Sequence, residues 1–160
     1  MKKIILHAFV IVAIAISFGS CTKETIQEIT GSMKATIDGT AWEATLASQA
    51  ATKYGDYIAV GGYNIAGQKI LIAIYGLTVG TYDLSILEGS TKVGSFFIES
   101  KDGAESERFI SSAGQVEITS IDEKRISGTF HFTAVKTAKG ITTKEITAGE
   151  FKNVLIISAK

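Results

Sequence analysis

From residue 32 to its end, the chain alternates apolar with polar residues in a succession of short segments. Thr, Ile, Val, Phe and Tyr dominate these segments, and none shows a convincing 3.6-residue helical period. A period of two places successive side chains on opposite faces of a strand, so each segment can bury one face and expose the other. The pattern predicts an all-β domain without helices.

Turn signals divide the alternating segments into about ten strands. Asp38-Gly39 is typical of a two-residue hairpin turn, in which both residues need positive φ angles. Asp122-Glu123-Lys124 and Lys139-Gly140 predict two later turns. The stretch 47–55 is expected to be loose, and the expected strands are 33–37, 42–46, 57–63, 69–75, 79–87, 93–99, 107–111, 116–119, 126–135, 141–146 and 151–157.

Strands without helices to cover them must pack against one another. Their number favours an antiparallel β-sandwich of about ten strands, and a flattened lipocalin-like or calycin-like β-barrel is the alternative. Segment 69–75 is apolar on both faces, which indicates a central strand. The inward faces are expected to bury a core that includes Met33, Trp42, Phe130 and Phe132.

The first twenty residues have the features of a bacterial signal peptide. Lys2 and Lys3 form a basic start, and an uncharged apolar run follows over residues 4–18. A membrane-spanning helix needs roughly 20 apolar residues, so this run is short for an anchor and suits a signal peptide. Residues 1–20 are therefore expected to be a leader that is removed.

Cys21 follows Phe18, Gly19 and Ser20 in a segment that resembles the lipobox of bacterial lipoproteins. The resemblance implies that the Cys21 thiol is lipidated and that Cys21 begins the mature protein. Two or more acyl chains give stable membrane anchoring. We expect residues 21–30 to be a flexible tether and residues 31–160 a single all-β domain. The protein would be exported and held in the cell envelope at the outer membrane, facing the periplasm or the surface.

Charge and cysteine content exclude several classes of function. Removal of the leader leaves 14 basic and 16 acidic residues, a net charge of −2, which provides no basic surface for nucleic acid. Cys21 is the only cysteine, so a disulfide within the chain is impossible. A mature part of about 140 residues can fold as one domain by burying a core, without metals or disulfides.

Few residues of the mature chain could carry catalysis or hold a metal. His131 is its only histidine and is expected on the outward face of its strand, whereas a zinc site needs three or four convergent ligands. The sequence has no Gly-x-Ser-x-Gly elbow and no phosphate-binding glycine motif. Asp102, Glu105 and Glu107 are expected to form a solvated loop cluster. We therefore expect no enzymatic activity, no metal and no cofactor.

Three tyrosines suggest one candidate binding surface. Tyr54, Tyr57 and Tyr63 flank a glycine-rich bend at Gly61-Gly62. Amphipathic rings of this kind can stack against a sugar or another flat ligand. The alternative is that these tyrosines only cover the ends of the sheet.

Five segments of the mature chain, made of turns and core positions, lie at residues 33–42, 80–82, 114–122, 126–132 and 146–151. In these segments the chain resembles a family of lipoproteins from Bacteroidetes that is classed only as a domain of unknown function. The resemblance implies a cell-envelope location and a β-rich fold, and it transfers no catalytic residue.

Together these features predict an envelope-anchored lipoprotein whose β-domain is a non-enzymatic binding, structural or interaction module. Its partners would be the membrane, through the N-terminal lipid, and a glycan, a small ligand or an envelope protein. Two alternatives are a barrel that carries a small apolar ligand and a hydrolase that acts on glycans. A wide interior cavity would favour the carrier, and two carboxylates about 5–10 Å apart in a groove would favour the hydrolase.

Overall fold

A computed structural model describes residues 31–46, 48–85, 93–98, 107–136 and 141–158. These residues form strands and no helix, which confirms the predicted all-β fold. The strands are β1 (Ser32–Ile37), β2 (Thr40–Glu43), β3 (Ala50–Tyr54), β4 (Tyr57–Tyr63), β5 (Gln68–Tyr75), β6 (Gly80–Asp83), β7 (Val93–Ile98), β8 (Glu107–Ile121), β9 (Arg125–Lys136) and β10 (Thr142–Ser158).

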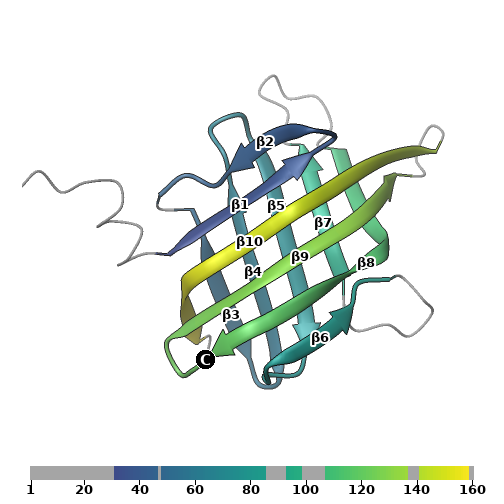
Figure 1. Cartoon of the computed structure of the whole chain (residues 1–160). Helices are drawn as coiled ribbons and strands as arrows, with labels where there is room; N and C mark the ends of the chain where they lie inside the picture. The colour runs from purple at the N-terminus through teal and green to yellow at the C-terminus, as the bar shows by residue number, and fades with distance from the viewer. Residues whose placement is uncertain (1–30, 47, 86–92, 99–106, 137–140, 159–160) are drawn as a thin grey trace, which may run out of the picture.

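The strands lie in two layers whose directions cross at an angle (Figure 1). The front layer has the order β2-β1-β10-β9-β8-β6, and the back layer has the order β3-β4-β5-β7. The C-terminal part of β10 pairs with β3, and the N-terminal part of β8 pairs with β7. These two long strands therefore join the layers at their edges, and the predicted sandwich is confirmed.

One strand pair departs from the expected antiparallel arrangement. The end of β10 runs parallel to β3, with Ile156 opposite Ala51 and Ser158 opposite Lys53. The other pairs of described strands are antiparallel. A parallel pair needs a long connection, and here almost the whole domain lies between the two strands in the sequence.

Two strands are longer than the sequence pattern predicts. The expected segments 107–111 and 116–119 belong to the single strand β8, and 141–146 and 151–157 belong to β10. Both strands contain register shifts at the places where the pattern breaks. A β-bulge inserts an unpaired residue and bends the strand without ending it. The alternation loses its phase there, which makes one bent strand look like two in the sequence.

The core lies between the layers and confirms the predicted inward faces. Met33, Trp42, Phe130 and Phe132 are each at most 3% exposed. The indole Nε1 of Trp42 donates a hydrogen bond to the carbonyl oxygen of Gln68 at 3.2 Å. The described core side chains form one cluster between the layers. The fold is thus a packed sandwich and not a hollow barrel.

Most of the predicted turns are also found. Asp38 and Gly39 both have positive φ angles, of 48° and 79°, as their hairpin requires. Asp122 makes the turn between β8 and β9, where its Oδ1 accepts hydrogen bonds from the backbone N–H groups of Lys124 and Arg125. The predicted Lys139-Gly140 turn lies outside the described residues.

The expectation of a loose stretch at 47–55 was wrong, because β3 occupies residues 50–54. This strand contains only one fully buried apolar side chain, Ala51. Lys53 lies opposite Ile58, which is fully buried, so the two side chains share the inward face. An inward lysine breaks the apolar alternation by which strands are recognised.

Candidate functional site

Three tyrosines stand in one row across the back layer. Tyr54 pairs with Tyr57 across β3 and β4, and Tyr57 pairs with Tyr75 across β4 and β5. The adjacent Ile58 and Ile74 are buried in the core. Because side chains alternate along a strand, the three tyrosines point to the outer face of the layer. We call Tyr54, Tyr57 and Tyr75 the tyrosine row.

Tyr57 is the central ring of this row and the least exposed. Its ring meets Tyr75 edge to face, with centroids 5.1 Å apart and planes at 62°. Tyr54 is 56% exposed and Tyr75 is 50% exposed, whereas Tyr57 is half-buried. Burial raises the pKa of the Tyr57 phenol above its usual value of 10.0, and the neighbouring Tyr75 and Tyr54 raise it further. In the tyrosine row, the rings of Tyr54 and Tyr75 are therefore accessible, and the half-buried ring of Tyr57 lies between them.

The structure brings together two of the three tyrosines that the sequence suggested. Tyr54 and Tyr57 are neighbours, but Tyr63 lies at the opposite end of β4, where it pairs with Lys69. Tyr63 is anchored through its backbone: its N–H donates to Ser48 Oγ at 3.1 Å, and its carbonyl accepts from the N–H of Thr45 at 2.9 Å. Tyr75 takes its place in the row, and only the β4–β5 register could have revealed this.

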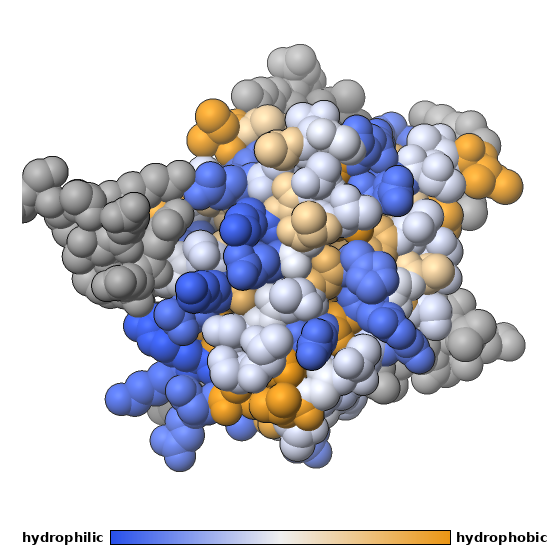
Figure 2. Space-filling model, in the orientation of Figure 1, coloured by the Kyte–Doolittle hydropathy of each residue, from blue (hydrophilic) through white to orange (hydrophobic). Residues whose placement is uncertain are grey.

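The outer face of β3, β4 and β5 has few charged residues between the tyrosine row and Tyr63. Between the tyrosine row and Tyr63, the outward positions of β3, β4 and β5 carry no acidic residue. The front layer presents a mostly hydrophilic face, and hydrophobic residues gather toward the lower end of the view (Figure 2). The two layers therefore offer different outer surfaces. Between the tyrosine row and Tyr63, the outward residues of β3, β4 and β5 are Ala50, Thr52, Ala59, Gly61, Leu71 and Ala73.

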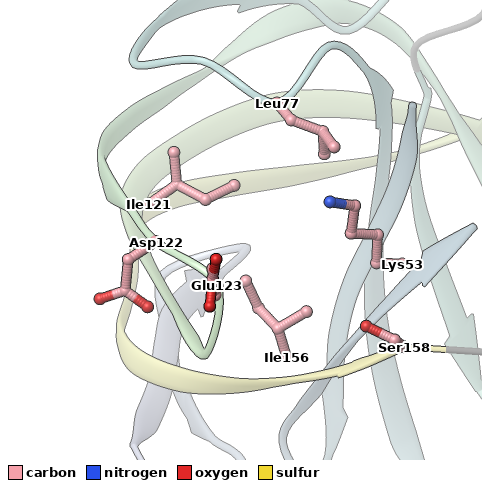
Figure 3. Close-up of a pocket in the computed structure, with 7 residues that line it drawn as sticks. All are labelled: Lys53, Leu77, Ile121, Asp122, Glu123, Ile156 and Ser158. Atoms are coloured by element: carbon pink, nitrogen blue, oxygen red, sulfur yellow. The ribbon is translucent and has the colours of Figure 1, made fainter. Parts of the chain in front are cut away.

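A pocket of about 570 Å³ is lined in part by Lys53, the neighbour of Tyr54 on β3, so it opens at the same end of the sandwich as the tyrosine row. Figure 3 shows its lining residues. The pocket lies between the layers, where β3 and β10 end, beside the β8–β9 turn and the loop after β5. Its volume is within the usual range for small-molecule sites. We call it the end pocket, and its described lining residues are Lys53, Leu77, Ile121, Asp122, Glu123, Ile156 and Ser158.

The walls of the end pocket combine aliphatic and charged side chains. Leu77, Ile121 and Ile156 are partly buried and pack against the core. Lys53 and Glu123 come from opposite sides, whereas the carboxylate of Asp122 points away from the other lining residues (Figure 3). The two backbone hydrogen bonds that hold Asp122 in its turn also lower the pKa of its carboxyl. The Asp122 carboxylate thus serves to stabilise the β8–β9 turn.

The other sequence candidates lie apart from this end or outside the described residues. His131 is exposed on β9, as expected, and borders a shallow hollow of about 440 Å³ beside the ion pair between Lys34 and Glu150. Glu107 forms an ion pair with Lys136, and the ammonium of Lys136 also lies 5.6 Å from the Phe109 ring centroid. Asp102 and Glu105, like Cys21, the leader and the tether, are outside the described residues.

The described residues contain no group of three His, Cys, Asp or Glu side chains that could hold a metal ion. They also contain no helix of the length and hydrophobicity needed to cross a bilayer.

Comparison with known proteins places the chain in a family. Residues 29–155 match a family described as a domain of unknown function, DUF6252. No curated protein and no solved structure matches the chain. The matched segment includes nine of the ten strands in full and most of β10. The chain therefore belongs to the DUF6252 family.

Proposed function

We propose that this protein is an envelope-anchored lipoprotein whose β-domain is a non-enzymatic ligand-binding module. The observation that carries the proposal is the end pocket, which opens between the layers at one end of the sandwich and combines aliphatic with charged side chains. A concave site with apolar walls and a few polar groups is typical of small-ligand sites. The tyrosine row lies at the same end, on the outer face of the back layer, and presents accessible rings there.

The lining of the end pocket supports binding more than hydrolysis. Hydrolysis of a glycan by two carboxylates requires that both face the scissile bond. Asp122 and Glu123 are adjacent in the sequence, but the Asp122 carboxylate is directed outward and held by backbone N–H groups. Glu123 is then the one described carboxylate that remains for the pocket.

The anchoring part of the proposal rests on the N-terminal sequence. The basic start, the apolar run and the segment that ends in Cys21 resemble bacterial lipoprotein leaders, and the later segments resemble Bacteroidetes lipoproteins. The ten residues between Cys21 and β1 could reach about 35 Å when extended. Such a tether would let the domain stand clear of the outer membrane.

Anchoring is tested by mass and fractionation. Membrane-extracted protein should begin at Cys21 and carry the mass of two or three acyl chains. The Cys21→Ala variant should leave the membrane fraction. A mature protein without acyl mass, or an unchanged membrane fraction for the variant, would contradict anchoring and leave the binding site to be tested separately.

Binding is tested on the mature protein in lipid nanodiscs, with methyl and aromatic NMR signals as the readout. The probes are laurate, cellotriose and the peptide alanyl-leucyl-alanine. At least one should shift the signals of Ile121, Ile156 or the tyrosine row, and leave those of Tyr63 unchanged. If none of the three shifts them at millimolar concentration, the ligand-binding function is wrong.

A further inference from the structure

The end pocket is lined by the side chain of one lysine. The ammonium group of Lys53 makes no hydrogen bond or ion pair with another described residue, although the position of Lys53 on β3 turns its side chain to the inward face. Lysine is rarely placed on an inward face unless its charge is paired. Its ammonium group points into the pocket (Figure 3), so an anionic ligand group there would gain a charged partner.

A carboxylate that has no ion-pair partner among the described residues lies across the same pocket. Glu123 is exposed at the β8–β9 turn and makes no ion pair with another described residue. Lys53 and Glu123 approach from opposite sides (Figure 3). The pocket is therefore positive on the β3 side and negative on the side of the turn, and a simple anion would meet attraction at one side and repulsion at the other.

The space between the two charges is bordered by aliphatic side chains. Leu77, Ile121 and Ile156 line the pocket and are all partly buried. Burial of apolar ligand surface against such side chains contributes roughly 25 cal/mol per Å². A complementary ligand therefore has opposite charges at its two ends and an apolar middle.

We propose that the end pocket binds a zwitterionic ligand with an apolar body, of which a short apolar peptide with free termini is the model. Its carboxylate pairs with Lys53, its ammonium group pairs with Glu123, and its apolar side chains lie against Leu77, Ile121 and Ile156. This inference rests on the proposed ligand-binding function and names the chemical class of the ligand.

The test pairs each protein charge with one peptide charge. The mature protein in nanodiscs is titrated with alanyl-leucyl-alanine, with its C-terminal amide and with its N-acetyl form, and the Kd is measured by calorimetry. Each blocked peptide should bind the unmodified protein about fivefold more weakly, because a partly exposed ion pair contributes up to about that factor.

Two variants assign the charges. Lys53→Met should bind the free peptide about as weakly as the unmodified protein binds the amide, and should no longer distinguish the two. It should still discriminate against the N-acetyl peptide. Glu123→Gln should show the reverse pattern. A residue with only a structural role would weaken all three peptides equally.

Matched controls use charges that do not line the pocket. Lys124 lies next to Glu123 and Glu117 lies on β8, and both are exposed. Lys124→Met and Glu117→Gln should keep both discriminations. Thermal unfolding by circular dichroism should show that every variant remains folded at the temperature of the titration.

The outcomes separate this inference from the proposed function. If laurate or cellotriose shifts the pocket signals and the peptide does not, the zwitterionic ligand is wrong and the ligand-binding function stands. If the peptide binds but Lys53→Met still distinguishes the free acid from the amide, the assignment of Lys53 is wrong. If no probe shifts the signals, the proposed function itself is wrong.

Discussion

Tyr57 and Tyr75 lie directly opposite each other on β4 and β5, and their rings meet edge to face with centroids 5.1 Å apart. Edge-to-face pairs are favourable because the positive edge of one ring meets the negative face of the other. The same contact covers the Tyr57 ring. The contact between the two rings therefore both stabilises the pairing of β4 with β5 and fixes how the rings of the tyrosine row are arranged.

The first prediction concerns the ionisation of Tyr57. Its pKa is raised above 10.0 first by burial and then by Tyr75 and Tyr54. Tyr75→Phe removes one ionisable neighbour, so the pKa of Tyr57 should fall toward 10.0 while part of the burial effect stays. An NMR pH titration of the Tyr57 ring carbons measures this. Tyr63→Phe, at the other end of β4, should leave the titration of Tyr57 unchanged.

The sign of the effect on stability follows from this shift. The neutral phenol of Tyr57 is favoured in the folded state. Its contribution to the free energy of unfolding is therefore fully present below the pKa that Tyr57 has in the unfolded chain, and it is lost as the pH rises through the pKa in the folded protein. Alkaline denaturation should therefore be steeper for the unmodified protein than for Tyr57→Phe. An identical pH dependence of the two would contradict the raised pKa.

The second prediction concerns Trp42, which is 2% exposed and is the only tryptophan. Trp42→Phe removes the hydrogen bond from Nε1 to the Gln68 carbonyl and leaves a void in the core. The free energy of unfolding should fall by roughly 1–3 kcal/mol. Urea denaturation followed by circular dichroism measures it. A loss below about 0.5 kcal/mol, the usual size for a surface change, would show that the indole is not an anchor.

The third prediction compares two adjacent positions at a bulge in β10. A Cβ on Gly149 would lie 2.4 Å from Cδ2 of Phe130, so Gly149→Ala should destabilise the protein by roughly 1–3 kcal/mol. Ala148 has a φ of 47°, which disfavours residues other than glycine. Ala148→Gly should therefore stabilise the protein by up to about 1 kcal/mol. Denaturation measures the free energy of unfolding of both variants. Changes of the same sign in the two variants would contradict the backbone geometry of the bulge.

The fourth prediction concerns Asp38, at the hairpin turn between β1 and β2. Its Oδ2 accepts a hydrogen bond from Lys144 Nζ at 2.6 Å, and its Oδ1 accepts one from the Glu145 N–H at 2.9 Å. Both interactions, the Lys144 contact first, hold the pKa of Asp38 below 3.8. The resulting stability is present above 3.8 and is lost as the pH falls through the folded pKa.

Asp38→Asn tests this contribution, because Asn tolerates the positive φ angle but carries no charge. The variant should be less stable at neutral pH by at most about 1 kcal/mol, since the ion pair is partly exposed. The difference should disappear in acid. Lys144→Met should give a similar loss, and the double variant should add little. A difference that persists at low pH would point to a cause other than the charge.

Much of the fold follows from local pattern. The Asp38-Gly39 turn, the inward faces of β1 and β9 and the burial of Trp42 agree with expectation, because alternation and turn chemistry act between residues near in sequence. β3 was missed because Lys53 faces inward. The two long strands were divided because bulges shift the phase of the alternation.

The candidate site depended on contacts that sequence spacing does not reveal. Tyr54 and Tyr57 are close in the sequence and were grouped from it, but their pairing required β3, and Tyr75 joined them only through the register of β4 and β5. Lys53 and Glu123 are brought to one pocket by the parallel pairing of β10 with β3 and by the β8–β9 turn.

The sequence by itself determined that the chain forms strands, which faces of most of them are buried and where several of them turn. It did so because side-chain alternation and turn conformation are properties of a few consecutive residues. Only the tertiary structure decided that β8 and β10 join the two layers and that a tyrosine row and a charged pocket share one end. Those features depend on pairing between distant strands, where hydrogen bonding and core packing select the partner and the register.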